Sequence, residues 1–308
     1  MARAIDTEAV ALPAGAYDWR RTIAWIDHNG NETERARLRG LLGRPRPEAK
    51  VIRTLEARQN DDGGFPSELI QGRPSSIDTT ALVLRWLQDL GTLAGAVAQR
   101  VVTYLFTVQR PDGSWDQPPG LVRYGPPPRL LPGDSRVQAL CTAQAAYWLV
   151  LLGHRHDHAV SRAMGYLRAR QAADGRFLGY IRTTWMAAAL FRCTEGPGSA
   201  VCARALDALG AVEAERWSAG ALVGMLNCMA EAGVSTRVPV VRQGVARLRA
   251  LAEPTGSWPS EDGEFYRVEV SLRALRVLLL YGAVSEPMSE VEGPQDRAGE
   301  PASGGGAS

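Results

Sequence analysis

Three histidines close together are the first residues in this sequence that could bind a metal. His154, His156 and His158 alternate along a short stretch that also contains Asp157, and imidazole nitrogen is a good ligand for zinc, copper and iron. The cluster directly follows Gly153, at the end of an apolar segment, where a solvated connection is expected. Alternate residues on an irregular loop seldom converge on one ion without further ligands, so we predict no metal and no other cofactor.

Two aspartates stand where apolar segments begin. Asp78 follows Ser75 and Ser76 and precedes Thr79, and Asp134 follows a proline-rich stretch. Serine, threonine and aspartate side chains cap helix N-termini by accepting a hydrogen bond from a backbone amide. The simplest interpretation of both aspartates is therefore helix capping, which leaves room for a second role.

Large aromatic side chains lie on or next to the apolar segments. A ring can simply fill a protein core, and that interpretation suits each of them alone. Together they suggest a pocket for an apolar ligand, because binding pockets are lined mainly by apolar and aromatic side chains. The set consists of Trp86, Tyr147, Trp148, Trp185, Phe265 and Tyr266.

Similar turns recur along the chain, between the helices that must position these residues. In each turn, Asp-Gly supplies the positive φ that a chain reversal needs, and the glutamine is expected to bond to backbone at the next helix terminus. Gly256-Ser-Trp258-Pro259 keeps only the second half of the pattern, and Trp217 lies near the middle of the interval before it. We therefore count five units, one of them degenerate. The three full turns are Gln59-Asn-Asp-Asp62-Gly63-Gly-Phe65, Gln109-Arg-Pro-Asp112-Gly113-Ser-Trp115 and Gln171-Ala-Ala-Asp174-Gly175-Arg-Phe177.

Each unit pairs an amphipathic helix with a more apolar one. The second helices, such as Ala143–Leu152, have little polar face and must be buried. Residues 17–43 are expected to supply a further helix or helix pair that closes the ring. We therefore predict an all-α fold, an (α/α)6-type barrel over residues 17–284, with a flexible segment 1–16 and a disordered tail 285–308. The first helices are predicted over 49–58, 96–108, 159–170, 200–209 and 240–251.

The turn pattern resembles the QW repeats of squalene–hopene and oxidosqualene cyclases and of the related protein prenyltransferase β-subunits. The resemblance covers roughly residues 49–282. It is specific for the fold superfamily and weak for any one activity, because function depends on a site carried by the fold.

This resemblance implies a catalytic acid at Asp78. Cyclases that begin by protonating an alkene carry Asp-x-Asp-Asp-Thr-Ala at the start of an inner helix, whereas residues 76–81 read Ser-Ile-Asp-Thr-Thr-Ala and keep the middle acid. Oxidosqualene cyclases use one acid in Asp-Cys-Thr-Ala-Glu, with Thr79 here in the cysteine position. Apolar burial would keep the carboxyl protonated, and Ser76 and Thr79 could tune it by hydrogen bonds. An epoxide, being more basic than an alkene, is the easier target, and Asp134 is a secondary acid candidate.

The prenyltransferase resemblance implies a zinc site made by aspartate, cysteine and histidine. The histidine position holds Arg267, and no Asp-x-Cys pair lies near residues 217–228. A zinc-dependent activity is therefore disfavoured.

A proline-rich insertion over residues 116–134 is predicted to cross the barrel mouth as a rigid lid. Arg123 or Arg129 within it could meet a diphosphate. Solvation of the loop explains both arginines equally simply, and we favour that interpretation.

Composition sets outer limits on function and location. The 308 residues are 45% hydrophobic and carry a net charge of +2, which gives no reason to expect nucleic acid as a partner. The four cysteines are scattered without a CxxC pair, and the first residues lack the apolar core of a signal peptide, so a cytoplasmic location is expected. No apolar run is long enough to span a bilayer, and peripheral membrane contact is kept as an expectation.

The leading hypothesis is a class II terpene cyclase-like enzyme acting on an apolar isoprenoid small molecule. Its alternatives are a non-catalytic αα-toroid that binds or scaffolds partners, and a divergent, zinc-independent prenyltransferase-like subunit. The cyclases that the chain resembles usually place their site between two barrels. One barrel therefore predicts either a homodimer or partner subunit that completes the pocket, or a small pocket for a short substrate. A central cavity with Asp78 pointing into it would favour the enzyme over the scaffold.

Overall fold

A computed structural model describes residues 17–43 and 49–283, and the regular secondary structure in these ranges is helical. They contain isolated bridges at Pro66–Ser75 and Gln171–Phe177 but no β-strand. The predicted all-α class is confirmed. The segments expected to be flexible or disordered, 1–16 and 285–308, lie outside the described residues, as do residues 44–48.

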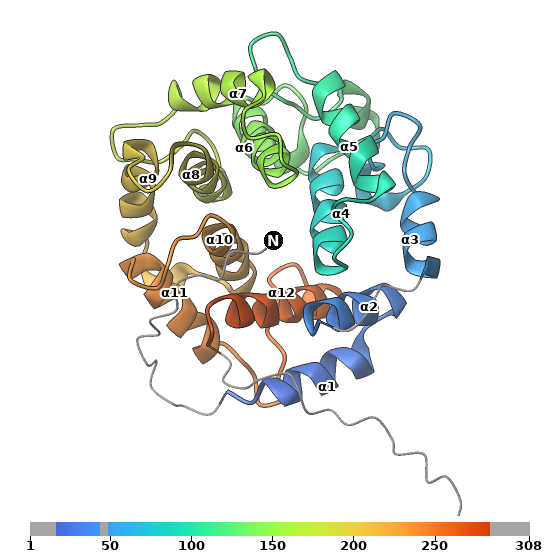
Figure 1. Cartoon of the computed structure of the whole chain (residues 1–308), viewed down its shortest axis with the longest axis vertical. Helices are drawn as coiled ribbons and strands as arrows, with labels where there is room; N and C mark the ends of the chain where they lie inside the picture. The colour runs from blue at the N-terminus through green and yellow to red at the C-terminus, as the bar shows by residue number, and fades with distance from the viewer. Residues whose placement is uncertain (1–16, 44–48, 284–308) are drawn as a thin grey trace, which may run out of the picture.

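Two concentric rings of α-helices form the barrel (Figure 1). Neighbouring inner helices contact one another in the order α2, α4, α6, α8, α10, α12 and back to α2. Every helix predicted as a first helix lies in the outer ring, and residues 17–43 supply the closing pair, α1 and α2. The inner ring contains α2 (Glu32–Leu41), α4 (Ile77–Asp89), α6 (Ser135–Leu151), α8 (Ile181–Glu195), α10 (Ala219–Glu231) and α12 (Arg267–Leu280); the outer ring contains α1 (Trp19–Asn29), α3 (Ala49–Glu56), α5 (Ala96–Thr107), α7 (His158–Arg168), α9 (Ala200–Gly210) and α11 (Pro239–Ala250).

The inner helices owe their position to their composition. In α6, every residue from Ala139 to Leu149 is buried, because a helix without a polar face is stable only when other helices surround it. Outer helices such as α7 bury one stripe and expose the rest. The sequence contrast between first and second helices therefore becomes the contrast between outer and inner rings.

The repeated turns join each unit to the next. Nε2 of Gln109 donates to the carbonyl of Gly113 in its own turn (3.0 Å) and to that of Ala159 at the start of α7 (2.8 Å). Gln59 and Gln171 make the same pair of bonds. The expected bond from the glutamine to the next helix terminus is therefore confirmed in all three full turns.

The last turn closes the ring against the first helix. Oγ1 of Thr22 in α1 donates to the carbonyl of Gly256 at 2.6 Å, in a buried contact between segments 234 residues apart. A Cβ on Gly256 would lie 2.6 Å from the Arg21 carbonyl carbon. The glycine is therefore needed for the close approach of the two ends of the barrel.

A second repeated hydrogen bond fixes the position of each inner helix along the barrel axis. The backbone N–H of the turn aromatic donates to a hydroxyl on the inner helix of the same unit, at 2.9–3.1 Å: Phe65 to Thr80, Trp115 to Thr142, Phe177 to Thr184 and Trp258 to Ser271. Because these hydroxyls occupy equivalent places, residues at the same offset from them lie at the same level of the barrel. This register is used below to place the site.

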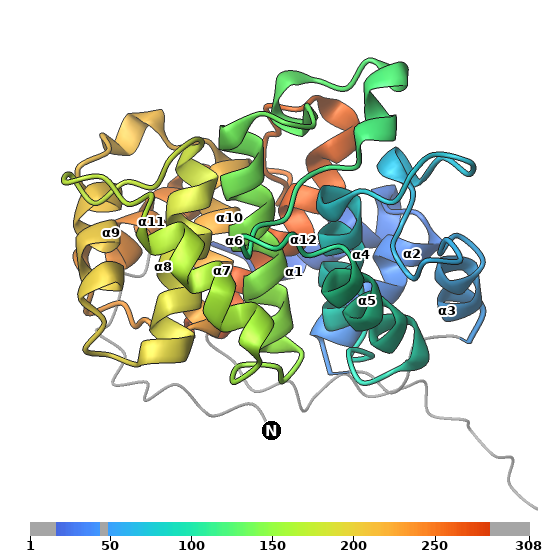
Figure 2. The ribbon, with the colours of Figure 1, turned by 90° about the horizontal axis from the view of Figure 1, so that it is seen from above.

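Short 3-10 helices decorate the connections: η1 (Ser67–Leu69), η2 (Pro119–Tyr124), η3 (Pro128–Leu130), η4 (Ala214–Arg216) and η5 (Glu264–Tyr266). The insertion that carries η2 and η3 projects beyond the helix ends, as Figure 2 shows in green. Since η5 leads into α12 and η3 leads toward α6, these connections surround the N-terminal ends of the inner helices. We call this end the mouth of the barrel.

Candidate active site

A cavity of about 340 Å³ occupies the centre of the barrel at the mouth. It is lined from α4, α6, α8, α10 and α12 and from the loops before α6 and α12. Charged side chains share its wall with the rings of Trp148, Trp185 and Tyr266, so the wall is more polar than the expected apolar pocket. The principal lining residues are Asp78, Leu82, Arg85, Arg129, Gln144, Trp148, Arg182, Trp185, Met186, Glu261, Asp262, Tyr266, Glu269 and Arg273.

Asp78 lines this cavity from the first turn of α4. The helix is capped by Ser76, whose side chain accepts from the backbone N–H of Thr79. The interpretation of Asp78 as the cap alone is therefore wrong. Its Oδ1 lies 3.2 Å from Nη1 of Arg182, and the two side chains are 27% and 42% exposed. The two groups therefore form a partly exposed ion pair at the mouth of the barrel.

The helix register divides the wall into two layers. Among the lining residues, those two before the aligned hydroxyls form the upper layer, Asp78, Arg182 and Glu269. Those two after them form the second layer, Leu82, Gln144, Met186 and Arg273. Four residues of helix separate the layers, which is about 6 Å of depth. The upper layer thus surrounds the entrance and the second layer lies beneath it.

A groove of about 350 Å³ runs beside the central cavity, between α2, α3, α4 and η5. Leu82, Tyr266 and Glu269 line both spaces. Trp86 lines the groove, with the Arg37 guanidinium 5.5 Å from its ring centroid. We call Leu82, Trp86, Phe265 and Tyr266 the aromatic groove. Phe265 is 86% exposed, which is unusual for a large apolar side chain unless a ligand or partner covers it.

Several predicted site residues lie away from the cavity. Thr79 is buried, and its Oγ1 accepts from the backbone N–H of Glu68. Asp134 caps α6 and is bonded to Arg136, which lowers the pKa of its carboxyl to about 2. The capping interpretation of Asp134 therefore holds, and the structure does not bring this carboxyl to Asp78. Ser76 is likewise committed to capping.

Two further expectations are only partly met. Tyr147 is completely buried and donates to Glu231 at the opposite end of the barrel, so it does not line the cavity. Arg123 stacks on the ring of Tyr124, at 4.8 Å, outside the cavity lining, whereas Arg129 from the same insertion does line it. The insertion therefore contributes one arginine to the mouth. Trp148 and Trp185 lie in the wall as predicted.

Arg182, Glu269, Arg273 and Gln144 were not predicted as site residues. Asp78 stands out in the sequence because it resembles a known motif, whereas these four lie in unremarkable helical segments. The turn alignment could have found them, since each lies two residues from an aligned hydroxyl and faces the same axis. That alignment depends on knowing which hydroxyl each aromatic amide contacts.

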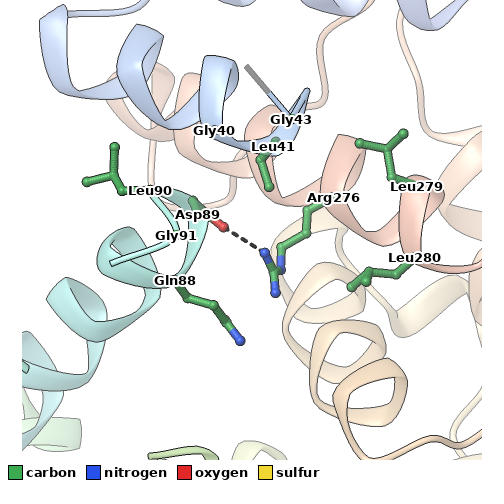
Figure 3. A pocket seen from close by; sticks show the side chains of 10 residues that line it. All are labelled: Gly40, Leu41, Gly43, Gln88, Asp89, Leu90, Gly91, Arg276, Leu279 and Leu280. Atoms are coloured by element: carbon green, nitrogen blue, oxygen red, sulfur yellow. Dashed lines mark hydrogen bonds and ion pairs between the residues drawn. The ribbon is translucent and has the colours of Figure 1, made fainter. Parts of the chain in front are cut away.

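A buried network of charged groups lies deeper in the barrel. Asp89 accepts from Arg37 through Oδ2 (2.9 Å) and from Arg276 through Oδ1 (3.1 Å), and Figure 3 shows the second of these contacts. Glu231 accepts from Arg85 (2.6 Å) and Arg276 (3.1 Å). Below the network, a cavity of about 440 Å³ opens between the C-terminal ends of α2, α4 and α12. The network separates this cavity from the mouth.

Burial and charge pairing oppose each other in this network. Burial alone would raise the pKa of Glu231, but Arg85 and Arg276 outweigh it and hold the pKa below its ordinary value of 4.5. The pKa of Glu269 is lowered in the same way, chiefly by Arg37. Burial lowers the pKa of the Arg273 guanidinium to about 10, so this group stays positively charged at neutral pH. All three groups are therefore charged at neutral pH inside the protein.

Within the described ranges, no group of three or more histidine, cysteine, aspartate or glutamate side chains is arranged to hold a metal. In the histidine cluster, Asp157 caps α7 and the His154 ring packs edge-on against Phe106 at 5.2 Å. Among these same residues, no helix has both the length and the apolar character to cross a bilayer.

The fold is shared with solved terpene cyclases. Type II terpene cyclase MstE from Scytonema matches over 85% of this chain and 96% of its own, with a TM-score of 0.57 and 17% identity. A protein from Actinoplanes matches over 85% and 98%, with a TM-score of 0.56 and 17% identity. ent-Copalyl diphosphate synthase from Streptomyces platensis matches over 85% and 50%, with a TM-score of 0.52 and 19% identity. No known sequence family and no curated protein matches the chain.

At such identities the likeness establishes the fold, and the expected αα-barrel is confirmed as a fold. The MstE chain is spanned almost completely.

Proposed function

We propose that the protein is a type II terpene cyclase-like enzyme in which Asp78 gives the proton that starts cyclisation of an isoprenoid. The observation that carries the proposal is the placement of one face of α4. Asp78, Leu82 and Trp86 follow one another at four-residue spacing, so they share that face. Asp78 lines the central cavity and Trp86 lines the aromatic groove. Leu82, between them, lines both the cavity and the groove. A prenyl chain lying along this face would bring its end to the carboxyl.

The chemistry balances with groups present in the wall. The neutral Asp78 carboxyl transfers its proton to a terminal alkene carbon or an epoxide oxygen, and neighbouring double bonds attack the cation to form rings. The final cation loses a proton to water, so the product is an isomer of the substrate. The faces of Trp148 and Trp185 could stabilise positive charge on the way.

The Asp78–Arg182 ion pair imposes a condition on this mechanism. A carboxylate paired with a guanidinium holds no proton to give, so the pair must separate before catalysis. Arg182 is the more exposed of the two side chains and has the longer stem, so it can move while Asp78 stays on the cavity wall.

The solved neighbours support an isoprenoid substrate without fixing its identity. MstE has been solved with geranylgeranyl dihydroxybenzoate as its substrate, and the match to that structure has a TM-score of 0.54 at 15% identity. The central cavity, at about 340 Å³, lies near the lower end of the range for ligand pockets. A short prenyl chain, or a longer one that extends into the aromatic groove, would fit this volume.

The test is turnover of farnesyl and geranylgeranyl compounds with terminal alkene or epoxide ends, followed by mass spectrometry of extracted products. We expect cyclic isomers from the wild type and at least a hundredfold loss in Asp78→Asn, in line with the usual contribution of a general acid. Asp207→Asn, on the exposed face of α9, is the matched control and should keep full activity. Equal turnover by Asp78→Asn would contradict the assigned acid.

A non-catalytic binding module is the second candidate, and the charged wall of the cavity is the observation that favours it. Four arginines and four carboxylates line the space, whereas a carbocation reaction calls for a mainly apolar one. A binding module would bind an isoprenoid with equal affinity in wild type and Asp78→Asn and return it unchanged.

A further inference from the structure

The second layer of the cavity contains a half-buried guanidinium, that of Arg273, whose Nε is buried without a hydrogen bond. Nε of Arg273 is inaccessible and has no hydrogen bond, and the whole guanidinium makes no hydrogen bond or salt bridge to any residue that the structure describes. The neighbouring acid, Glu269, is already bonded to Arg37 through both carboxylate oxygens. Glu269 interacts with Arg273 electrostatically but makes no hydrogen bond to it, so the N–H donors of this guanidinium are available to an anion in the cavity.

A polar amide in the same layer also lacks a partner. Gln144 on α6 is 1% exposed, and its Oε1 is buried without a hydrogen bond among the described residues. Buried polar atoms are nearly always satisfied, so an exception calls for a ligand or water at that place. Gln144 and Arg273 line one cavity at one level of the barrel.

The backbone opposite makes room for this arginine. A Cβ on Gly224 of α10 would lie 3.4 Å from Nη2 of Arg273 and 3.1 Å from the Trp185 ring. The bare backbone of α10 thus leaves room for both the guanidinium and the Trp185 ring at the cavity wall. Burial lowers the pKa of Arg273 to about 10, which still leaves it charged at neutral pH.

We propose that Arg273 and the amide of Gln144 bind an oxyanionic group of the ligand, a phosphate or a carboxylate, inside the central cavity. Guanidinium groups bind such anions with two parallel hydrogen bonds, and the amide of glutamine can add a third. This inference concerns the polar end of the ligand. It rests on the proposed function only in taking the rest of the ligand to be an isoprenoid.

Each carboxylate that lines the cavity has another partner or is exposed to solvent. Asp78 is paired with Arg182 and Glu269 with Arg37, both in the upper layer, while Glu261 accepts from Ser218 at 2.5 Å. Asp262 is an exposed residue of the loop before η5. These carboxylates surround the entrance, whereas the Arg273 guanidinium lies a turn deeper.

Binding of an oxyanion would also change the upper layer. Arg182 lies one helical turn above Met186 of the second layer, and its side chain is 42% exposed. An anion beside Arg273 offers Arg182 a second partner and draws it away from Asp78. The ligand itself would then separate the ion pair and free the Asp78 carboxyl to contact the substrate.

The test measures binding of inorganic phosphate, pyrophosphate and benzoate to the full chain by isothermal titration calorimetry, at constant ionic strength. We expect saturable binding of at least one anion, with about tenfold or greater loss of affinity in Arg273→Met and Gln144→Leu, since each removes a direct hydrogen-bond donor. Arg53→Met, on the exposed face of α3, is the control. Phosphate and pyrophosphate binding without benzoate binding would assign a phosphate head, and the reverse would assign a carboxylate.

Stability separates a ligand role from a structural one. Arg273→Met should leave the melting temperature unchanged or raise it, because it removes a half-buried charge that makes no hydrogen bond. A large drop in melting temperature, anion affinity equal to wild type in Arg273→Met, or no binding of any of the three anions would each overturn the inference. Anion binding by a protein that cyclises nothing would refute only the proposed function, because binding is measured without an isoprenoid.

Discussion

Arg182 reaches Asp78 across the mouth of the barrel, with Nη1 3.2 Å from Oδ1, although α6 stands between their helices in the inner ring. Another pair, Arg37 and Asp89, has a similar length of 2.9 Å but is completely buried. The first pair is open to solvent and can separate, whereas the second is enclosed by its neighbours. Exposure, rather than distance, distinguishes a movable pair from a fixed one in this protein.

Removal of one arginine from each pair should therefore have very different effects. We expect Arg37→Met to lower the free energy of unfolding by about 3 kcal/mol, because Asp89 and Glu269 each lose a buried charged partner. Arg182→Met should change it by about 1 kcal/mol or less, the usual value for an exposed pair. Urea denaturation followed by circular dichroism measures both. Similar losses in the two variants would contradict the distinction.

Stability should depend on pH through Glu231. Its pKa is lower in the folded protein than the ordinary value of 4.5 because Arg85 and Arg276 outweigh the effect of burial. The ionised group therefore favours folding above about pH 4.5, and this contribution is lost as the pH falls through the lowered pKa. Glu231→Gln should be less stable than wild type at neutral pH, and the difference should shrink on acidification.

Urea titrations at several pH values from 7 to 3 would measure that difference. Glu213→Gln, which is exposed on the loop before η4, serves as the control and should follow the wild type throughout. A gap between Glu231→Gln and wild type that stays constant over this range would show that Glu231 does not carry the effect.

The turn glycines should differ in their tolerance of a methyl group. Gly175 has a φ of 87°, and a Cβ there would lie 2.1 Å from the carbonyl oxygen of Arg204 on α9. Gly91 has a φ of 69° with open space around it. We expect Gly91→Ala to cost about 1–2 kcal/mol from backbone strain alone, and Gly175→Ala to cost clearly more. Thermal unfolding of the two variants tests this, and equal losses would rule out the steric contribution.

Phe265 should affect ligand affinity without affecting folding. Its ring is 86% exposed, so Phe265→Ser should change the unfolding free energy by about 0.5 kcal/mol or less. If an isoprenoid covers the ring, loss of about 1.5 kcal/mol of apolar burial raises KM or Kd roughly tenfold. Ile70→Ser, at another exposed apolar position (48%), should leave affinity unchanged. Unchanged affinity in Phe265→Ser would place the ligand elsewhere.

The architecture was predictable because each repeat carries a recognisable sequence pattern. Gln109, Gly113 and Trp115 lie within one turn, and their bonds to backbone and to the inner helix follow from local geometry. The apolar character of α6 likewise assigned it to the inner ring. Such features depend on neighbours in sequence, which a single chain reveals.

The site was less predictable because its contacts join distant segments. Asp78 was found through a resemblance, but its partner Arg182 lies 104 positions later and belongs to no motif. The free N–H donors of Arg273 depend on Glu269 having been taken by Arg37. Competition of this kind between α2 and α12 is set by packing, which composition and periodicity do not report.

The buried contact between Thr22 and the carbonyl of Gly256 makes the barrel a repeat array whose first and last members touch. Open repeat stacks have free ends, from which unfolding can spread one unit at a time. A closed ring offers no such starting point, so the weakest unit is braced on both sides. Its assembly carries a matching constraint: the fifth unit cannot finish packing until the first helix, synthesised more than two hundred residues earlier, is in place to receive it.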